Sequence, residues 1–131
     1  MRIPVQINEH SAEPLYRQVE NQLRALIISG QLQEGILLPS IREFAADLKC
    51  SVITIRRVYQ DLENEGLLRT RQGTGTFVTG VEEELRSRMG EEQVRQLIDD
   101  MIVRSYNLGW TRQQLSRLIE DMLNKHDDQQ T

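Results

Sequence analysis

The stretch that decides the fold is SIREFAADLKCSVITIRRVYQDLENEG, residues 40–66. Its first half begins with Ser40, and Glu43 follows three residues later. This spacing is a capping box, in which each side chain can satisfy an exposed backbone N–H of the first helical turn. A short helix is predicted to follow, because apolar side chains recur there at helical spacing. The expected buried face of this helix is Ile41, Phe44, Ala45 and Leu48.

The second half of the stretch predicts a longer helix that begins after Ser51 and ends at Gly66. Serine is a favourable N-cap, and glycine commonly ends a helix. Two short helices joined by about three residues form the helix-turn-helix pattern, in which the second helix is offered outward. The core face of the second helix is expected to be Ile55, Val58, Tyr59 and Leu62. Its outward face then carries Ile53, Arg57, Gln60 and Asn64, with Arg56 on the flank.

The flanking segments predict a winged helix-turn-helix. Upstream, residues 14–30 combine an N-terminal proline, apolar residues at helical spacing and a closing glycine, which predicts an amphipathic helix. Downstream, the apolar period changes from helical to alternating. Residues 67–71 and 76–79 are therefore expected to form a β-hairpin, joined by a glycine-containing turn at residues 72–75. The fold is expected to be mainly α, with three helices and a hairpin wing in a domain at residues 10–80.

The rest of the chain is expected to be a two-helix dimerisation module at residues 81–126. Residues 81–92 are highly charged and read as a connector, and the sequence NLGWT separates the two helices. Their apolar stripes are Val94, Leu97, Ile98, Met101 and Ile102, and Leu115, Leu118, Ile119, Met122 and Leu123. Two helices that pack only on each other leave much of such a surface in water. A second copy supplies a matching surface by two-fold symmetry, so these residues are expected to form a homodimer interface.

Composition excludes several classes of protein. The 131 residues contain no apolar run near the ~20 needed to span a bilayer, and the first residues lack the apolar stretch of a signal peptide. A cytoplasmic location without membrane contact is expected. One cysteine and two histidines exclude an internal disulfide and provide no zinc-ligand spacing. No set of nucleophile, base and orienting residue stands out, so neither an enzyme nor a cofactor is expected.

The charge is unevenly distributed along the chain. The net charge is −4, but residues 1–80 hold nine basic and nine acidic residues, whereas residues 81–131 hold seven basic and eleven acidic residues. The acidity therefore belongs to the C-terminal part. In the front part, a group of basic residues falls close together: Arg42, Lys49, Arg56, Arg57, Arg69 and Arg71. This group is compatible with a basic patch for nucleic acid, although composition alone does not require one.

Residues 14–78 resemble the DNA-binding domain of the GntR family of bacterial transcription regulators. The resemblance is carried by LPSIREFA (residues 38–45), TIRRVYQDLENEGLL (residues 54–68) and RQGTGTFV (residues 71–78). The short helical extension that follows is similar to that of the YtrA subfamily. The resemblance implies DNA contacts at Arg42, at residues 51–56 and at the wing tip Gly73. Many family members carry a polar or basic residue at the position of Val52 or Ile53, so the preferred base sequence is not implied.

The residue types give physical reasons for the same site. An α-helix fits the major groove, arginine can read guanine through two parallel hydrogen bonds, and an exposed isoleucine could touch a thymine methyl group. Hydroxyl side chains at a helix start can bond phosphates, helped by the N-terminal N–H groups. Glycine in the wing lets the backbone approach a minor groove closely. The expected DNA-binding residues are Arg42, Ser51, Ile53, Thr54, Arg56, Arg57, Arg71 and Gly73.

The expected function is that of a sequence-specific regulator of transcription, acting as a repressor that binds a palindromic operator as a homodimer. An alternative is a winged-helix module for protein association, in which Arg56 and Arg57 form salt bridges with Asp61 and its neighbours. A third reading, compatible with the first, adds an unknown small-molecule effector. Two helices per chain cannot enclose a pocket of ~300 Å³ or more, so such an effector would sit at the dimer interface or between the domains.

Overall fold

The computed structural model describes residues 2–129 and divides the chain into two compact units, residues 1–90 and residues 91–131. The division falls after Gly90, whereas the sequence placed the domain boundary after residue 80. The reason lies in the intervening segment, because Val81 and Met89 pack against the core of the first unit.

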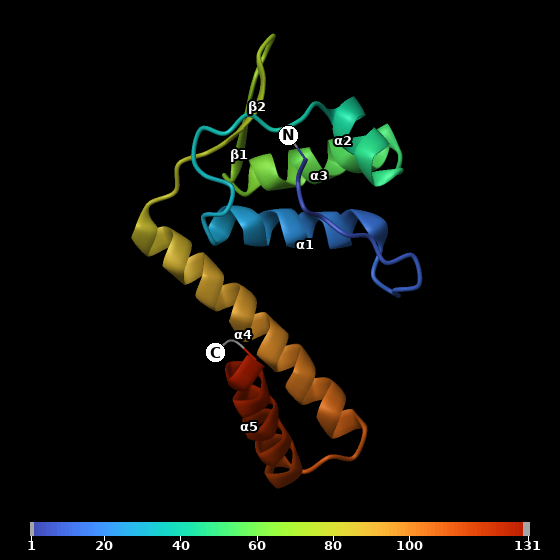
Figure 1. The fold of residues 1–131 in the computed structure, drawn as a ribbon, viewed down its shortest axis with the longest axis vertical. Helices are drawn as coiled ribbons and strands as arrows, with labels where there is room; N and C mark the ends of the chain where they lie inside the picture. Colours follow the sequence, from blue (N-terminus) through green and yellow to red (C-terminus); the bar gives the residue numbers. More distant parts are fainter. Residues whose placement is uncertain (1, 130–131) are drawn as a thin grey trace. The chain divides into compact units, whose positions relative to one another are not determined.

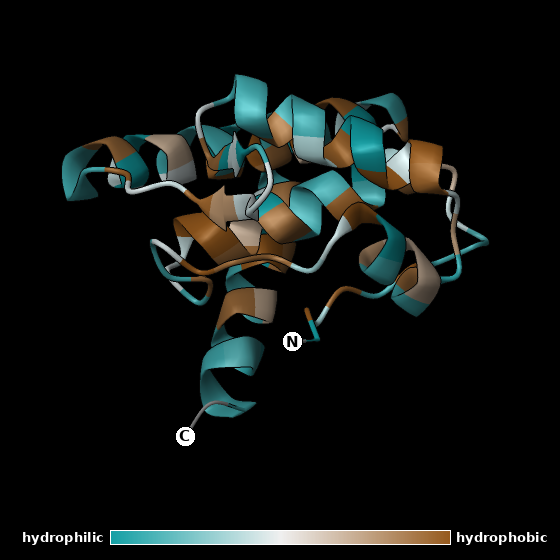
Figure 2. Cartoon of the chain, turned by 90° about the horizontal axis from the view of Figure 1, so that it is seen from above, coloured by the Kyte–Doolittle hydropathy of each residue, from teal (hydrophilic) through white to brown (hydrophobic). Residues whose placement is uncertain are grey.

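The first unit has the predicted element order of a winged helix-turn-helix (Figure 1). Its elements are α1 (Leu15–Ile28), α2 (Ile41–Leu48), α3 (Val52–Asn64), β1 (Leu68–Arg71) and β2 (Gly75–Val78). Each helix carries both hydrophobic and hydrophilic stretches (Figure 2), as expected for helices that bury one face. The largest fully buried side chains are Val19, Leu23, Phe44, Ile55, Val58, Leu62 and Leu67. The prediction of a mainly helical winged domain is confirmed.

Local capping fixes the helix-turn-helix. The Ser40 Oγ atom accepts a hydrogen bond from the Glu43 backbone N–H at 3.1 Å, and the Ser51 Oγ atom accepts one from the Thr54 N–H at 3.1 Å. Between the two helices, Lys49 has a φ of 56°, and it is the one non-glycine residue with positive φ among residues 2–129. This left-handed residue ends α2 and turns the chain within three residues, so that α3 starts in a fixed direction.

The wing is an antiparallel hairpin in which Leu68 pairs with Val78 and Arg71 pairs with Gly75. A short extended segment lies along its outer edge, where the Leu38 N–H donates to the Thr76 carbonyl at 2.8 Å. The hairpin is also tied to α3, because the Thr70 hydroxyl donates to the Glu63 carboxylate at 2.8 Å. These bonds hold the wing against the extended segment and the end of α3.

The N-terminal residues add a layer that the sequence reasoning missed. Ile3 and Val5 are buried in the core of the first unit. The segment is held on α1 by side-chain amides, since Gln22 both accepts from the Gln6 N–H at 2.9 Å and donates to the Gln6 carbonyl. The alternation of apolar and polar residues at positions 3–7 was the available signal for an extended segment with one buried face.

Two helices, α4 (Glu83–Asn107) and α5 (Arg112–Gln129), follow the wing. The expected charged connector is wrong in one respect, because its residues from Glu83 onward are already helical. Glutamate, arginine, leucine and methionine are good helix formers, and acidic residues in the first turn favour the helix dipole. The break between the helices is as predicted, with the Gln114 N–H donating to the Thr111 Oγ1 atom at 3.2 Å in a second capping box.

Candidate nucleic-acid interface

The N-terminal half of α3 presents an exposed face that is rigidly supported from behind. The four residues predicted for its core face are all buried: Ile55, Val58, Tyr59 and Leu62. The Tyr59 hydroxyl donates to the Pro39 carbonyl at 2.8 Å, which ties α3 to the entrance of α2. On the opposite face, 76% of the Ile53 surface is exposed. The helix is therefore fixed in rotation, and a large apolar side chain is left facing outward beside Arg56.

A groove with a volume of about 610 Å³ lies between the start of α2, the side of α3 and the wing. Its lining brings together two of the predicted DNA-binding residues, Arg42 from the first turn of α2 and Arg56 from α3, with Thr74 and Thr76 of the hairpin. These residues are distant in the sequence, so the groove is a product of the fold. It presents two guanidinium groups beside the exposed end of α3.

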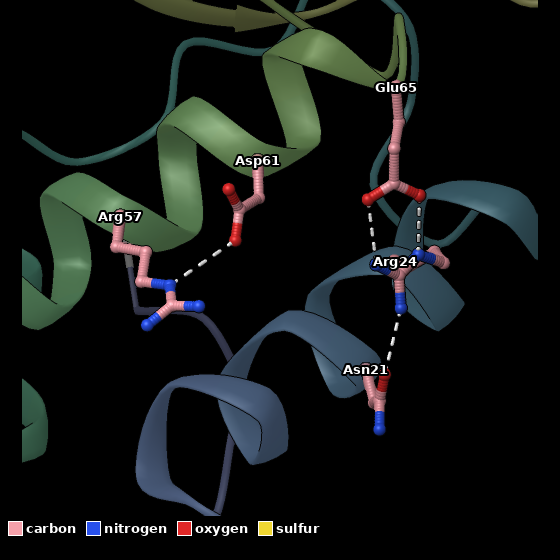
Figure 3. Close-up of polar contacts among 5 residues, drawn as sticks. All are labelled: Asn21, Arg24, Arg57, Asp61 and Glu65. Atoms are coloured by element: carbon pink, nitrogen blue, oxygen red, sulfur yellow. Dashed lines mark hydrogen bonds and ion pairs between the residues drawn. The ribbon is translucent and has the colours of Figure 1, made fainter.

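Arg57 lies on a different side of α3 from Arg56. Its guanidinium carbon is 3.7 Å from the centre of the Tyr16 ring, and its Nε atom is 3.7 Å from the Asp61 Oδ2 atom (Figure 3). The side chain is still 57% exposed. The sequence placed Arg57 opposite the core, but the structure tilts it toward α1. The two adjacent arginines therefore occupy separate environments.

The hydroxyl groups at the start of α3 are both engaged in capping. The Ser51 Oγ and Thr54 Oγ1 atoms are 2.8 Å apart, and Ser51 also accepts from the Thr54 N–H. Ser51 stays exposed and can still meet a phosphate through its remaining hydrogen-bonding capacity.

The two wing glycines serve different purposes. Gly73 has a φ of 83°, and a Cβ atom placed there would meet nothing within 4 Å. Gly75 has a φ of 132°, which favours glycine, and a Cβ atom there would lie 2.8 Å from the Cδ1 atom of Leu37, whose exposed side chain would have to move. Arg71, at the end of β1, is exposed beside the turn. The wing tip is thus free on all sides, and space at Gly73 is available to a partner.

The wing tip gives a prediction that separates binding from folding. Valine at Gly73 would be strained by the positive φ, whereas asparagine tolerates this conformation. We expect Gly73→Asn to lower operator affinity roughly tenfold, about the size of one lost contact, while leaving the melting temperature nearly unchanged. Binding and thermal unfolding are measured on the same sample. Unchanged affinity would show that the wing is a passive hairpin.

Charge pairing in the first unit leaves the groove positive although the unit's charges nearly cancel. Two hydrogen bonds of 2.9 and 2.7 Å join Arg24 to the Glu65 carboxylate, and Asp61 pairs with Arg57 (Figure 3). Within residues 2–129, by contrast, the structure has no ion pair for a second set of arginines: Arg42, Arg56, Arg69 and Arg71. The Asp61 and Glu65 carboxylates are thus occupied on the α1 side, and Glu43 lines the groove together with Arg42 and Arg56. The arginines of α2, the groove and the wing remain available to an anion.

A buried carboxyl group lies behind α3 and was not foreseen. Glu20 of α1 is only 7% exposed, and its Oε1 atom has no hydrogen-bond partner within the part of the chain that the structure describes. Burial raises the pKa of Glu20 to about 7, and the hydrogen bond and charge of Asp61 act in the same direction, while Arg24 opposes them. The signal in the sequence was a glutamate next to Val19, three residues before Leu23, within an apolar stripe.

This carboxyl group predicts a pH-dependent stability. The pKa of Glu20 is raised from 4.5 to about 7 on folding, so the folded chain binds a proton between these pH values and loses stability as the pH rises through them. We expect Glu20→Gln to stabilise the protein at pH 8 by up to about 3 kcal/mol and to have little effect near pH 4. Urea unfolding at both pH values measures the difference. The exposed Glu9→Gln is the control, and an equal effect of Glu20→Gln at both pH values would contradict the assignment.

The second unit divides the predicted dimerisation residues into two groups. Leu115 is buried, and three others are half-buried between α4 and α5: Met101, Ile102 and Ile119. The remaining five are exposed: Val94, Leu97, Ile98, Leu118 and Met122. Leu97 is the extreme case among these, with 70% of its surface exposed. The helix pair thus uses one side of its apolar surface for its own packing and leaves the other side uncovered.

No helix in residues 2–129 is long and apolar enough to cross a bilayer. No group of three or more potential metal ligands was found in the same range.

Comparisons with known proteins agree on one family. Residues 15–78 match the sequence profile described as "Bacterial regulatory proteins, gntR family". The HTH-type transcriptional repressor YtrA of Bacillus subtilis is 34% identical over 100 residues, which cover 73% of this chain and 77% of that protein.

Similar solved structures also include GntR-family regulators. YtrA from Sulfolobus acidocaldarius, a GntR-family transcription factor, is 27% identical and aligns with a TM-score of 0.59 over 76% of this chain and 97% of that one. AraR(DBD), solved in complex with an operator, is 30% identical, with a TM-score of 0.50 over 59% of this chain and 94% of that one. These relatives are regulators of transcription and not enzymes. The chain belongs to the GntR family of bacterial regulatory proteins, as a YtrA-like DNA-binding regulator.

Proposed function

We propose that this protein is a cytoplasmic, sequence-specific transcriptional repressor that binds a palindromic operator as a homodimer. The observation that carries the proposal is the groove where Arg42 and Arg56 meet the wing beside the exposed end of α3; neither arginine has an ion pair among residues 2–129. The similar repressor YtrA and the operator complex of AraR(DBD) support it.

The residues divide into those that read bases and those that position the protein. The N-terminal turns of α3 would enter the major groove, where Arg56 reads a guanine and the exposed Ile53 meets a thymine methyl group. Arg42, Ser51 and Thr54 lie at helix starts and would bond phosphates. Arg57 would reach a phosphate on the α1 side. The wing would border the minor groove with Arg71 and Gly73.

Dimerisation supplies the affinity that a single winged domain of zero net charge lacks. We infer that residues 10–80 bind DNA and that residues 81–126 form the dimerisation module. The exposed stripe of the second unit matches a second copy of itself about a two-fold axis. Two linked domains would read half-sites about 34 Å apart and gain avidity from binding together.

A salt titration tests DNA binding against the alternative of a protein-association module. Each phosphate contact releases counterions, so we expect log Kd for duplex DNA to rise linearly with log salt concentration, with about 0.9 added to the slope for each phosphate contacted. Binding is followed by fluorescence anisotropy of a labelled duplex between 50 and 200 mM salt, about the range over which such affinities change by orders of magnitude. No binding at low salt would favour the association module.

A further inference from the structure

The geometry points to a second role for the side chains behind α3: we propose that the Glu20–Asp61 carboxyl pair positions Arg57 for a DNA phosphate and makes operator binding take up a proton. This inference rests on the proposed function. It concerns a cluster formed by Tyr16, Glu20, Arg57 and Asp61, none of which lines the groove between α3 and the wing.

The cluster forms a continuous chain of contacts across the interface between α1 and α3. Glu20 of α1 is buried, its Oε1 atom has no hydrogen-bond partner among residues 2–129, and Asp61 of α3 lies close enough to raise the pKa of Glu20. Asp61 in turn pairs with Arg57 at 3.7 Å (Figure 3). The Arg57 guanidinium carbon lies 3.7 Å from the centre of the Tyr16 ring. The guanidinium is therefore fixed by an aromatic face and a carboxylate, while more than half of the side chain remains exposed to a ligand.

The charges around Glu20 favour one shared proton. From α3, Asp61 and Glu65 both raise its pKa, and Arg24 of α1 lowers it. Arg24 is already committed to Glu65 through two hydrogen bonds, so it compensates Glu20 only in part. The N-terminal segment packed on α1 contributes buried apolar side chains, Ile3 and Val5. A protonated Glu20 can donate a hydrogen bond to the Asp61 carboxylate, which also pairs with Arg57.

DNA binding and this proton are then linked. A phosphate at Arg57 brings further negative charge toward Glu20 and disfavours its ionised form, so binding raises the proton affinity of the pair. By reciprocity, protonation strengthens binding by the same factor. Above neutral pH, the ionised Glu20 draws Arg57 inward and opposes the phosphate. In Glu20→Gln a neutral amide replaces the protonated acid. Between pH 6 and pH 8, we expect the Kd of the unmodified full-length protein to rise by a factor about five times as large as the factor for Glu20→Gln.

The test uses an operator duplex selected from random DNA and full-length protein at constant ionic strength. Calorimetry at pH 7 in two buffers of different ionisation enthalpy gives the number of protons taken up on binding. We expect the unmodified protein and the control Glu9→Gln to take up more protons than Glu20→Gln does. Both histidines are present in all three proteins, so their contribution cancels.

Four results distinguish the possibilities. Equal proton uptake by the unmodified protein and Glu20→Gln would overturn the inference. If Glu20→Gln failed to fold, Asp61→Asn would replace it, and retention of full proton uptake by Asp61→Asn would also overturn the inference. Binding that is tight but independent of pH would leave the proposed function intact and remove this regulation alone, whereas no binding at any pH would remove both.

Discussion

Leu97→Asp is expected to separate the homodimer into monomers and to weaken operator binding by about a hundredfold or more, the scale of avidity lost when two linked sites act independently. Leu97 is 70% exposed within one chain, so a charged residue there costs the monomer little. At a two-fold interface the same change places two carboxylates in an apolar contact, because each residue of such an interface meets the same patch on the partner. Burying an unpaired charge is strongly unfavourable.

A matched substitution on the same helix controls for charge. Gln96→Asp adds an identical carboxylate on the opposite face of α4, next to Leu97 in sequence but outside the apolar stripe. It should leave both the sedimentation coefficient and the operator affinity unchanged. Circular dichroism confirms that both variants keep their helices. A Leu97→Asp protein that still sediments as a dimer would contradict the role assigned to the second unit. A monomeric Leu97→Asp protein that binds the operator as tightly as the unmodified protein would contradict it as well.

Arg56→Ala is expected to cost about 1–3 kcal/mol per half-site and to relax specificity at one base pair in each half-site, because a bidentate contact to guanine is lost. Both half-sites of a palindrome contain this contact, so the loss for the dimer is about twice as large. Arg57→Ala is expected to behave differently. Its guanidinium is held on the α1 side by Tyr16 and Asp61, so its loss should weaken all sequences alike and reduce the salt dependence.

Titrations against the operator and its single-base variants distinguish the two arginines. Arg88→Ala serves as the control, since it removes an exposed arginine from α4, away from the groove. Equal losses on every sequence for Arg56→Ala would show that Arg56 contacts phosphate only. Unchanged affinity in both Arg56→Ala and Arg57→Ala would place the DNA surface elsewhere on the molecule.

Much of the fold could be predicted because its determinants are local. Ser40 and Ser51 cap the two helices of the helix-turn-helix as their spacing indicated, and the core face of α3 follows from the helical period alone. The position of the wing follows from the change of period after Gly66, with strand ends within one residue of those observed. The left-handed Lys49 was not predicted, although the interruption at that position was.

The remaining features depend on tertiary packing that sequence spacing does not encode. A helical projection places Arg57 opposite the core, but the distance to Tyr16 depends on how α1 crosses α3. The raised pKa of Glu20 likewise arises from burial against α3 and from Asp61. The groove that joins Arg42 to Arg56 exists only once α2, α3 and the wing are assembled.

Selection of bound fragments from random duplex DNA by the full-length protein is the decisive test of sequence-specific binding as a dimer. We predict an enriched palindrome whose half-sites have centres about one helical turn, 10–10.5 base pairs, apart, or a multiple of that spacing. Each half-site should contain a guanine that is no longer enriched when Arg56→Ala is used for the selection. Recovery of no common sequence, or of a single half-site without a symmetric partner, would contradict sequence-specific binding as a dimer.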